Sequence, residues 1–304
     1  MGKKWDQDLK RQTGEEWVRF DGIFLNPPLW EIQPERVPLT SYTTEDGMLV
    51  HFYERGHGSL KMQCHAGIPN AAAMQVLVAL IRLAQCKGWD KDIYIHLVDV
   101  LEQLHMADSG QNREMVRDYI HMWRMVELEY RGYHDGIPWD YLLFRPLEEA
   151  VHFPIGRYKG LFKIRFGRAF QRMLSGAGCP DARFIKLDTE IYSRLKGRYA
   201  LRLYEILMQN LTYRNPDADG IIRWPIGTDN LRAWMGVTGP TKEFKRNIKN
   251  AIEELRRIAG WNIILRSKGR RDAILQFATA KRLDAIERPS AVVPSQTLLE
   301  PPST

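Results

Sequence analysis

The strongest constraint on the fold is the order of elements predicted between residues 198 and 277. Apolar residues recur at helical spacing in Arg198–Leu211 and again in Thr241–Ala259. A shorter helix is expected over Thr228–Met235, with Thr228 as its N-cap. The glycine- and proline-rich segment Gly236–Pro240 separates the short helix from the long one. A short helix, a turn and a long helix together indicate a helix-turn-helix unit.

Two strands are predicted to follow this unit, over Asn262–Arg266 and Ala273–Phe277. The segment Lys268–Arg271 between them would form the tip of a β-hairpin. Three helices followed by a β-hairpin is the element order of a winged helix, whose longer helix would enter the major groove of DNA.

A similar order is predicted upstream, without a strong repeat of the sequence itself. Its elements are a strand over Met48–Tyr53, helices over Ala71–Gln85 (N-cap Asn70), His96–Leu104 and Gln111–Met125, and a hairpin joining Val126–Tyr133 to Trp139–Phe144 through Asp135-Gly136. We therefore expect an α+β fold of two tandem winged-helix domains, each with three helices plus a β-hairpin wing.

The expected domain limits follow from composition. Residues 1–45 are polar with scattered prolines and predict a flexible N-terminal lead-in. Residues 46–180 would form the first winged helix and residues 181–288 the second. Residues 289–304, rich in proline, serine and threonine, predict a disordered tail.

The positive charge of the chain is concentrated in its second half. The net charge is +7 overall, with −1 over residues 1–180 and +9 over residues 181–288. A basic unit beside a neutral one is typical of a protein that binds a polyanion. The alternative is a basic, solvated surface that has no partner.

The long helix Thr241–Ala259 is the strongest candidate for a DNA-reading element. Its apolar positions form one stripe, and four basic residues share another face: Lys242, Lys245, Arg246 and Lys249. These side chains could donate to guanine or neutralise phosphates, and Thr241 at the expected N-cap could hold a phosphate. An ordinary surface helix with a lysine-rich face is the alternative.

Two further basic sets are candidates for contact with DNA. The wing and its tip carry Arg266, Lys268, Arg270 and Arg271, which would contact backbone phosphates or a minor groove. The third helix of the first segment carries Arg113, Arg117 and Arg124, with Glu114 and Asp118 interleaved. That second face fits either a DNA contact or a protein-binding surface.

Catalytic signatures are missing from the sequence, so we expect neither an enzyme nor a bound cofactor or metal. No two of the eight histidines lie two residues apart, as a rolling-circle nuclease requires. Gly236–Lys242 does not fit the spacing of a phosphate-binding loop. The three cysteines, Cys64, Cys86 and Cys179, lie far apart and favour a reducing cytoplasm. No apolar run is long enough for a membrane span, and no signal peptide is apparent.

The residues also resemble a known family, the iteron-binding Rep proteins that initiate plasmid replication. The resemblance is most specific in LKGRYALRLYEILMQN (Leu195–Asn210), TDNLRAWMGV and TKEFKRNIKNAIEELRRIAGWNIILRSKGRRDAILQF. In the family a basic helix ends in a Glu-Leu or Glu-Ile pair, and here Glu254-Leu255 holds that place. GIPNAAAMQVLVALIRLAQ is similar to the opening helix of the family's N-terminal winged helix. The resemblance covers residues 48–283, and the spacing between the halves, residues 145–185, departs from the family pattern.

The resemblance implies two winged helices, WH1 and WH2. WH2 would bind repeated origin sequences in double-stranded DNA through Lys242, Lys245, Arg246 and Lys249, and WH1 would add a DNA contact and mediate dimerisation. Such initiators open the origin, recruit the host initiator and the replicative helicase, and repress their own promoter as dimers in equilibrium with monomers. The location implied is the bacterial cytoplasm, at the plasmid or nucleoid.

Two other functions remain open. A winged-helix transcriptional repressor without a role in replication would use the same modules, although two winged helices without a ligand-sensing domain favour an initiator. A protein-interaction scaffold with an incidental basic face is the alternative from another class.

Overall fold

The computed structural model describes residues 17–21, 29–30, 32, 41–43, 49–55, 58–88, 92–134, 137–175, 184–211, 224–268 and 272–278. The helices are α2 (Ala71–Cys86), α3 (Leu97–Gln103), α4 (Gly110–Arg124), α5 (Arg168–Ser175), α6 (Thr189–Arg194), α7 (Arg198–Leu211), α8 (Thr228–Trp234) and α9 (Thr241–Ala259). The strands are β1 (Trp17–Asp21), β2 (Ser41–Thr43), β3 (Leu49–Arg55), β4 (Gly58–Cys64), β5 (Ile93–His96), β6 (Val126–His134), β7 (Ile137–Phe144), β8 (Leu147–His152), β9 (Leu161–Phe166), β10 (Phe184–Asp188), β11 (Trp224–Gly227), β12 (Asn262–Lys268) and β13 (Asp272–Ala278).

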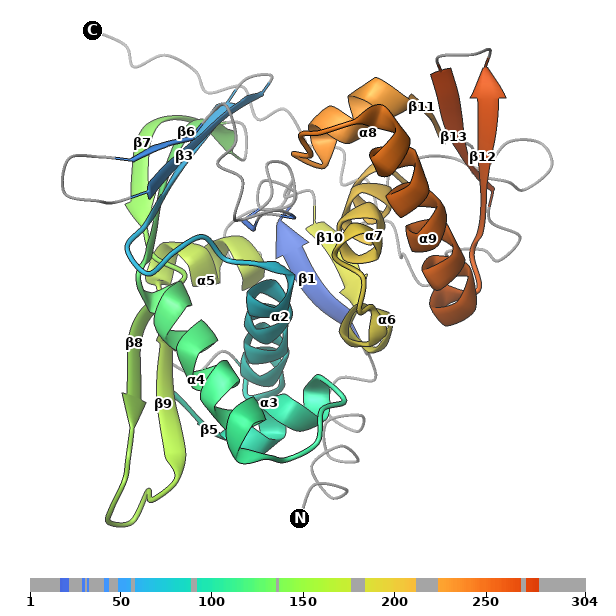
Figure 1. The fold of residues 1–304 in the computed structure, drawn as a ribbon. Coiled ribbons are helices and arrows are strands. Elements are labelled where there is room, and N and C mark those ends of the chain that lie inside the picture. The colour runs from blue at the N-terminus through green and yellow to red at the C-terminus, as the bar shows by residue number, and fades with distance from the viewer. Residues whose placement is uncertain are drawn as a thin grey trace, which may run out of the picture.

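The C-terminal unit has the predicted winged-helix order α7, β11, α8, α9, β12 and β13. Its three strands form an antiparallel sheet in the order β11-β13-β12, with Ile226 opposite Leu275. In Figure 1 the three helices lie to one side of this sheet. The stripe predicted on α9 is buried, because Phe244, Ile248 and Leu255 pack toward α7 and the rest of the core.

The N-terminal unit repeats this plan with α2, β5, α3, α4, β8 and β9. Its sheet has the order β5-β9-β8, so the first strand pairs with the last, as it does in the C-terminal unit. Asn70 caps α2 as predicted: its side-chain oxygen accepts a hydrogen bond from the backbone N–H of Ala73 at 2.9 Å. The tandem winged-helix fold expected from the sequence is therefore confirmed.

The wing of the N-terminal unit is a different hairpin from the one predicted. The hairpin over 126–144 forms as β6–β7, but β6 pairs with β4 in a five-stranded sheet of order β2-β3-β4-β6-β7. The wing is β8–β9, since β9 pairs with β5 as β13 pairs with β11. The sequence pattern of a half-buried hairpin does not specify which distant strand it joins.

The segment expected to be a flexible lead-in contributes to the folded core where it is described. β1 pairs antiparallel with β10, and Leu29, Trp30 and Ile32 are buried. The scattered prolines that suggested a loose segment do not prevent burial of the large apolar side chains between them. The proposed tail, residues 289–304, lies outside the described residues, and the domain limits stay a prediction.

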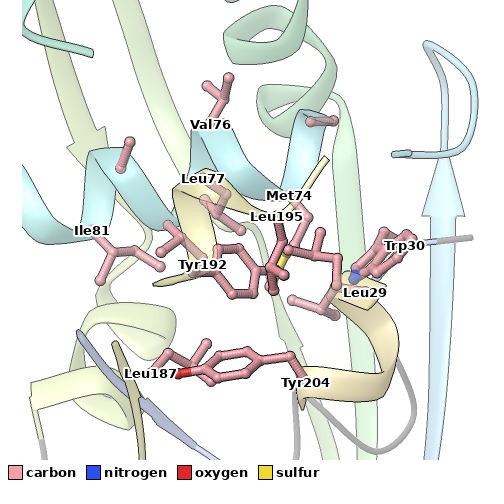
Figure 2. Close-up of a cluster of buried hydrophobic side chains, with 14 of the residues drawn as sticks. Leu29, Trp30, Met74, Val76, Leu77, Ile81, Leu187, Tyr192, Leu195 and Tyr204 are labelled. Atoms are coloured by element: carbon pink, nitrogen blue, oxygen red, sulfur yellow. The ribbon is translucent and has the colours of Figure 1, made fainter. Parts of the chain in front are cut away.

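The two units share one hydrophobic core. Figure 2 shows Met74, Leu77 and Ile81 of α2 in a cluster with Tyr192 and Leu195 from the other side of the α2–α6 contact. The short helix α6 packs against both α2 and α9. The side-chain amide of Gln75 donates to the carbonyls of Tyr192 and Leu195, at 2.9 and 2.8 Å, so that α2 satisfies acceptors at the end of α6.

Candidate nucleic-acid interface

The basic residues of α9 are displayed on the side opposite its buried stripe. Lys242, Arg246 and Lys249 are exposed, and none of them forms an ion pair among the described residues, whereas Lys245 is half-buried. The spacing of four and then three residues places the three exposed cations along one face. The predicted basic face is therefore present, on the second helix of a helix-turn-helix.

One basic residue on this helix escaped the sequence prediction. Arg257 is exposed and follows Arg246 by eleven residues, which is three helical turns. Arg257 extends the basic face past the exposed Glu253. The same helical spacing, followed beyond Lys249, would have identified this residue from the sequence. Its neighbour Arg256 instead donates from Nη2 to the carbonyl of Ile263 at 2.6 Å, which ties the end of α9 to β12.

The N-terminus of α9 differs from the prediction. Pro240, not Thr241, is the N-cap, and no side chain caps the first turn. Arg232 of α8 donates from Nη1 to the Thr241 hydroxyl at 3.1 Å and from Nε to the carbonyl of Val237 at 3.3 Å. Likewise Gly227, not Thr228, is the N-cap of α8. The prediction assumed that a hydroxyl residue preceding an apolar pattern is the cap, but here each threonine is the first residue of its helix.

The orientation of α9 is fixed by a carboxylate on its inner side. Oε1 of Glu254 accepts hydrogen bonds from the backbone N–H groups of Lys196 at 2.6 Å and Gly197 at 3.1 Å. These N–H groups lie at the start of α7, where the helix has no internal acceptors for them and where negative charge is favoured. Glu254 therefore holds α9 against the start of α7.

A buried polar network lies behind the helix-turn-helix. Arg202 and Glu205 are fully buried and form an ion pair of 2.8 Å along α7. Glu205 also accepts from Trp30 Nε1 at 2.9 Å and from the Tyr192 hydroxyl at 2.6 Å. Arg202 donates from Nη2 to the carbonyl of Trp234 at the end of α8, at 3.0 Å. The network links the N-terminal segment, α6, α7 and α8.

Two tyrosines around this network are held in the neutral form. Desolvation, followed by the charge of Glu205 and the hydrogen bond to it, raises the pKa of Tyr192 well above its usual value. Desolvation, followed by the charge of Asp188, also raises the pKa of Tyr204, whose hydroxyl accepts from the Asp188 N–H at 2.9 Å. Both rings therefore act as neutral, structural groups at physiological pH.

The predicted wing residues are placed only in part. Arg266 and Lys268 belong to β12, the strand that follows α9 in the chain. Nothing is described of their side chains. Arg270 and Arg271 lie outside the described residues.

The predicted contacts on the first unit divide into two kinds. Arg117 and Arg124 on α4 are exposed and form no ion pair among the residues described. Arg113 instead forms a two-pronged pair with Asp108, with distances of 2.5 and 2.6 Å. That hydrogen bonding lowers the pKa of Asp108. Glu114 and Asp118 are exposed on the same helix, so α4 presents mixed charge.

Nothing in the described part of the chain has the geometry of a metal centre. Among those residues, no group of three or more His, Cys, Asp or Glu side chains could hold a metal ion. Within the same residues, no helix is long and apolar enough to cross a membrane.

Comparisons with known proteins agree with this architecture. Residues 63–208 match the family model described as initiator replication protein, WH1. No curated protein matches the chain. A crystal structure of selenomethionine derivatives of domain 2 and domain 3 of RctB is 12% identical, with a TM-score of 0.61 over 84% of this chain and 97% of that one.

Two further solved structures match the chain in part. The RctB domains 2-3 structure is 14% identical, with a TM-score of 0.55 over 80% of this chain and 93% of that one. A crystal structure of the Pi initiator protein in complex with iteron DNA is 13% identical, with a TM-score of 0.47 over 69% and 93%. At such identities the RctB likeness establishes the fold.

Proposed function

We propose that this chain initiates plasmid replication by binding repeated double-stranded origin sequences through α9, because residues 63–208 match the family model of the initiator replication protein WH1 domain. The observation that carries the proposal is the exposed basic face of α9, with Lys242, Arg246 and Lys249 unpaired among the described residues. Lys245 lies beside that face.

The chemistry of this face fits double-stranded DNA. A helix about 10–12 Å across fits the major groove, and lysine and arginine donate to guanine O6 and N7 or neutralise phosphates. The N-terminus of α9 has no side-chain cap, so its backbone N–H groups remain suited to a phosphate. Glu254 and the buried Arg202–Glu205 pair give the helix a fixed base, as a sequence reader requires.

The WH2 wing would add contacts through Arg266, Lys268, Arg270 and Arg271. WH1 would supply an accessory DNA contact through Arg117 and Arg124, with Arg113 contributing less because Asp108 neutralises it. WH1 would also mediate a homodimer in equilibrium with the monomer. We also propose that the chain binds DNA without a catalytic step of its own.

Beyond recognition, the proposed role is to open the adjacent origin DNA and to recruit the host initiator and replicative helicase. We also propose that the dimer represses its own promoter and that the protein acts in the bacterial cytoplasm, at the plasmid.

The test is a gel-shift assay of the purified chain against the DNA that flanks its own gene, with scrambled competitor. Direct repeats should give a regular ladder of complexes, and a plasmid carrying them should depend on the protein for maintenance. A single complex on an inverted repeat, without plasmid maintenance, would instead identify a winged-helix transcriptional repressor. Binding that is indifferent to sequence, or no binding, would overturn the proposal.

The variant that tests the interface is Lys242→Gln with Arg246→Gln. Its matched control is Arg131→Gln with Arg145→Gln, which removes the same charge from exposed side chains that pair with Glu129 and Glu127 on the five-stranded sheet. The double variant on α9 should lose specific DNA binding, and the control double variant should keep it. Equal effects of the two pairs would mean that the basic face of α9 does not read DNA.

A further inference from the structure

The tip of the WH1 wing, residues 153–160, is a closed and well-bonded loop between β8 and β9. The backbone N–H of Phe153 donates to the carbonyl of Leu161 at 3.0 Å, and the N–H of Gly160 donates to the carbonyl of Phe153 at 2.8 Å. Gly156 has a φ of +83°, a left-handed conformation that glycine adopts without steric cost. Figure 1 shows this hairpin projecting from the N-terminal unit at the lower edge of the view.

Three aromatic rings pack together at the tip, one from β5 and two from the tip itself. Tyr94 of β5 stacks on Tyr158 with ring centroids 5.1 Å apart and on Phe153 at 6.3 Å. Phe153 and Tyr158 contact each other at 5.6 Å. Each such pair adds attraction beyond the area it buries, so the loop has a firm aromatic base.

An apolar side chain stands out from this base. Ile155 is 80% exposed, the largest exposure among the described large hydrophobic residues. Arg157 and Lys159 are exposed beside it, the guanidinium of Arg157 lies 5.7 Å from the centre of the Tyr158 ring, and no acidic residue occurs in the tip. A rigid loop that carries an exposed isoleucine between a proline and two cations has the composition of a minor-groove wedge.

Ion pairs stiffen the sheet behind the tip. Arg165 pairs with Asp92 at 2.7 Å and with Glu149 at 3.2 Å, while Lys163 pairs with Glu149 at 2.9 Å. These residues connect all three strands of the β5-β9-β8 sheet. An inserted side chain must keep its position against the stacking of the bases. The ion pairs between β8, β9 and Asp92 would help to hold the base of the tip in place.

We propose that the 153–160 tip inserts Ile155 between base pairs from the minor groove and thereby distorts duplex DNA. Arg157 and Lys159 would neutralise the phosphates that flank the opened step. A narrow loop enters the minor groove, which is about 6 Å wide, and flexible pyrimidine–purine steps are the least costly to unstack. The inference rests on the proposed function, because it assumes that α9 has placed the protein on duplex DNA.

The experiment compares Ile155→Ser with wild type on the flanking duplex selected by gel shift. The readouts are the bend angle from circularly permuted fragments and the permanganate reactivity of thymines. Wild type should bend the duplex and expose thymines at one position per bound protein, and Ile155→Ser should lose both. The affinity of the Ile155→Ser variant for the duplex should fall about tenfold, because the variant loses an apolar contact. The salt dependence of its binding should not change, because no charge is removed.

The matched control is Leu143→Ser, which removes another exposed apolar side chain, 43% exposed, from β7. It should leave bending and thymine reactivity unchanged. A companion variant, Arg157→Ala with Lys159→Ala, should reduce the slope of log affinity against log salt by up to about 2. Because Ile155 is mostly exposed, its substitution should leave the thermal unfolding midpoint near that of wild type.

The outcomes separate the wedge from the proposed function. If wild type binds the duplex through α9 but Ile155→Ser bends it equally, the wedge is refuted and duplex recognition stands. If Ile155→Ser changes only the proportion of dimer, the tip is a protein contact and the wedge is again refuted. If wild type binds no duplex, the proposed function fails and the wedge fails with it.

Discussion

The carboxylate of Glu254 lies directly over Gly197, accepting the glycine N–H at 3.1 Å through Oε1 and at 3.2 Å through Oε2. A β-carbon built on Gly197 would lie 2.4 Å from Oε2, a distance that nonbonded atoms do not tolerate. A side chain at residue 197 would therefore displace the Glu254 carboxylate from this position.

Glu254→Ala should lower the free energy of unfolding by about 1–3 kcal/mol, because backbone N–H groups at the start of α7 lose a charged acceptor. Its matched control is Glu253→Ala on the same helix, an exposed glutamate that forms no contact among the described residues. That change should stay within about 0.5 kcal/mol. Urea unfolding measures both.

The same contact can be tested from the glycine side. Gly197→Ala should destabilise the wild type by displacing the Glu254 carboxylate, and should cost less in the Glu254→Ala background, where the displaced group is gone. If the two effects on the free energy of unfolding add in this double-mutant cycle, the position of the Glu254 carboxylate does not require a glycine at residue 197.

Binding to duplex DNA should weaken steeply with salt. If about six to eight phosphates are neutralised, the slope of log affinity against log salt should be roughly −5 to −7. Neutralising Lys242 and Arg246 should reduce its magnitude by about 2 as well as removing sequence preference. Fluorescence anisotropy over a salt series provides the slopes, and an unchanged slope would place both cations away from phosphate.

Glu205→Ala should lower the free energy of unfolding far more than any substitution at the surface. It leaves Arg202 buried without its carboxylate and also removes the acceptor of Trp30 and Tyr192. Breaking one side of a buried pair costs about 3–5 kcal/mol. By contrast Tyr192→Phe, which keeps the ring and loses one donor to Glu205, should cost about 1–2 kcal/mol. Comparable losses for the two variants in urea unfolding would contradict the central role of Glu205.

Alkaline pH should destabilise the chain through its buried tyrosines. The folded state raises the pKa of Tyr192, so only the unfolded chain releases that proton above the ordinary value of 10.0. The stabilisation is complete below that pH and falls above it by about 1.4 kcal/mol per pH unit for each such tyrosine. Tyr192→Phe should therefore have a shallower decline between pH 10 and 11 than wild type. Equal slopes would mean that Tyr192 titrates normally in the fold.

The C-terminal unit could be predicted in detail because its signals are local. The limits of α7 and α9 match the predicted helices, since apolar periodicity specifies their length and Pro240 and Gly260 delimit α9. The basic face of α9 follows from the same periodicity. The contact between Glu254 and the start of α7 does not follow from that periodicity, because Gly197 and Lys196 lie 57 and 58 residues away in the chain.

The rest of the fold depends on pairings that no local pattern specifies. β1 pairs with β10 across more than 160 residues, and Trp30 reaches Glu205 across 175. β5 and β9 are short and separated by the inserted β6–β7 hairpin, so the WH1 wing was assigned to the wrong hairpin. The packing of Tyr94 on Phe153 and Tyr158 at the 153–160 tip likewise has no local sequence signal, because β5 and the tip lie far apart in the chain.

The shared core has a consequence for how the chain responds to damage. Because α2, α6 and α7 bury their side chains in one cluster, the two units should melt in a single cooperative transition. A core substitution in α2, a helix outside the proposed DNA-reading face of α9, then lowers the fraction of molecules that present a folded α9. Under the proposed function, this would lower the amount of active initiator in the cell. Plasmid copy number would then depend on the stability of the N-terminal unit as well as on the affinity of the C-terminal one.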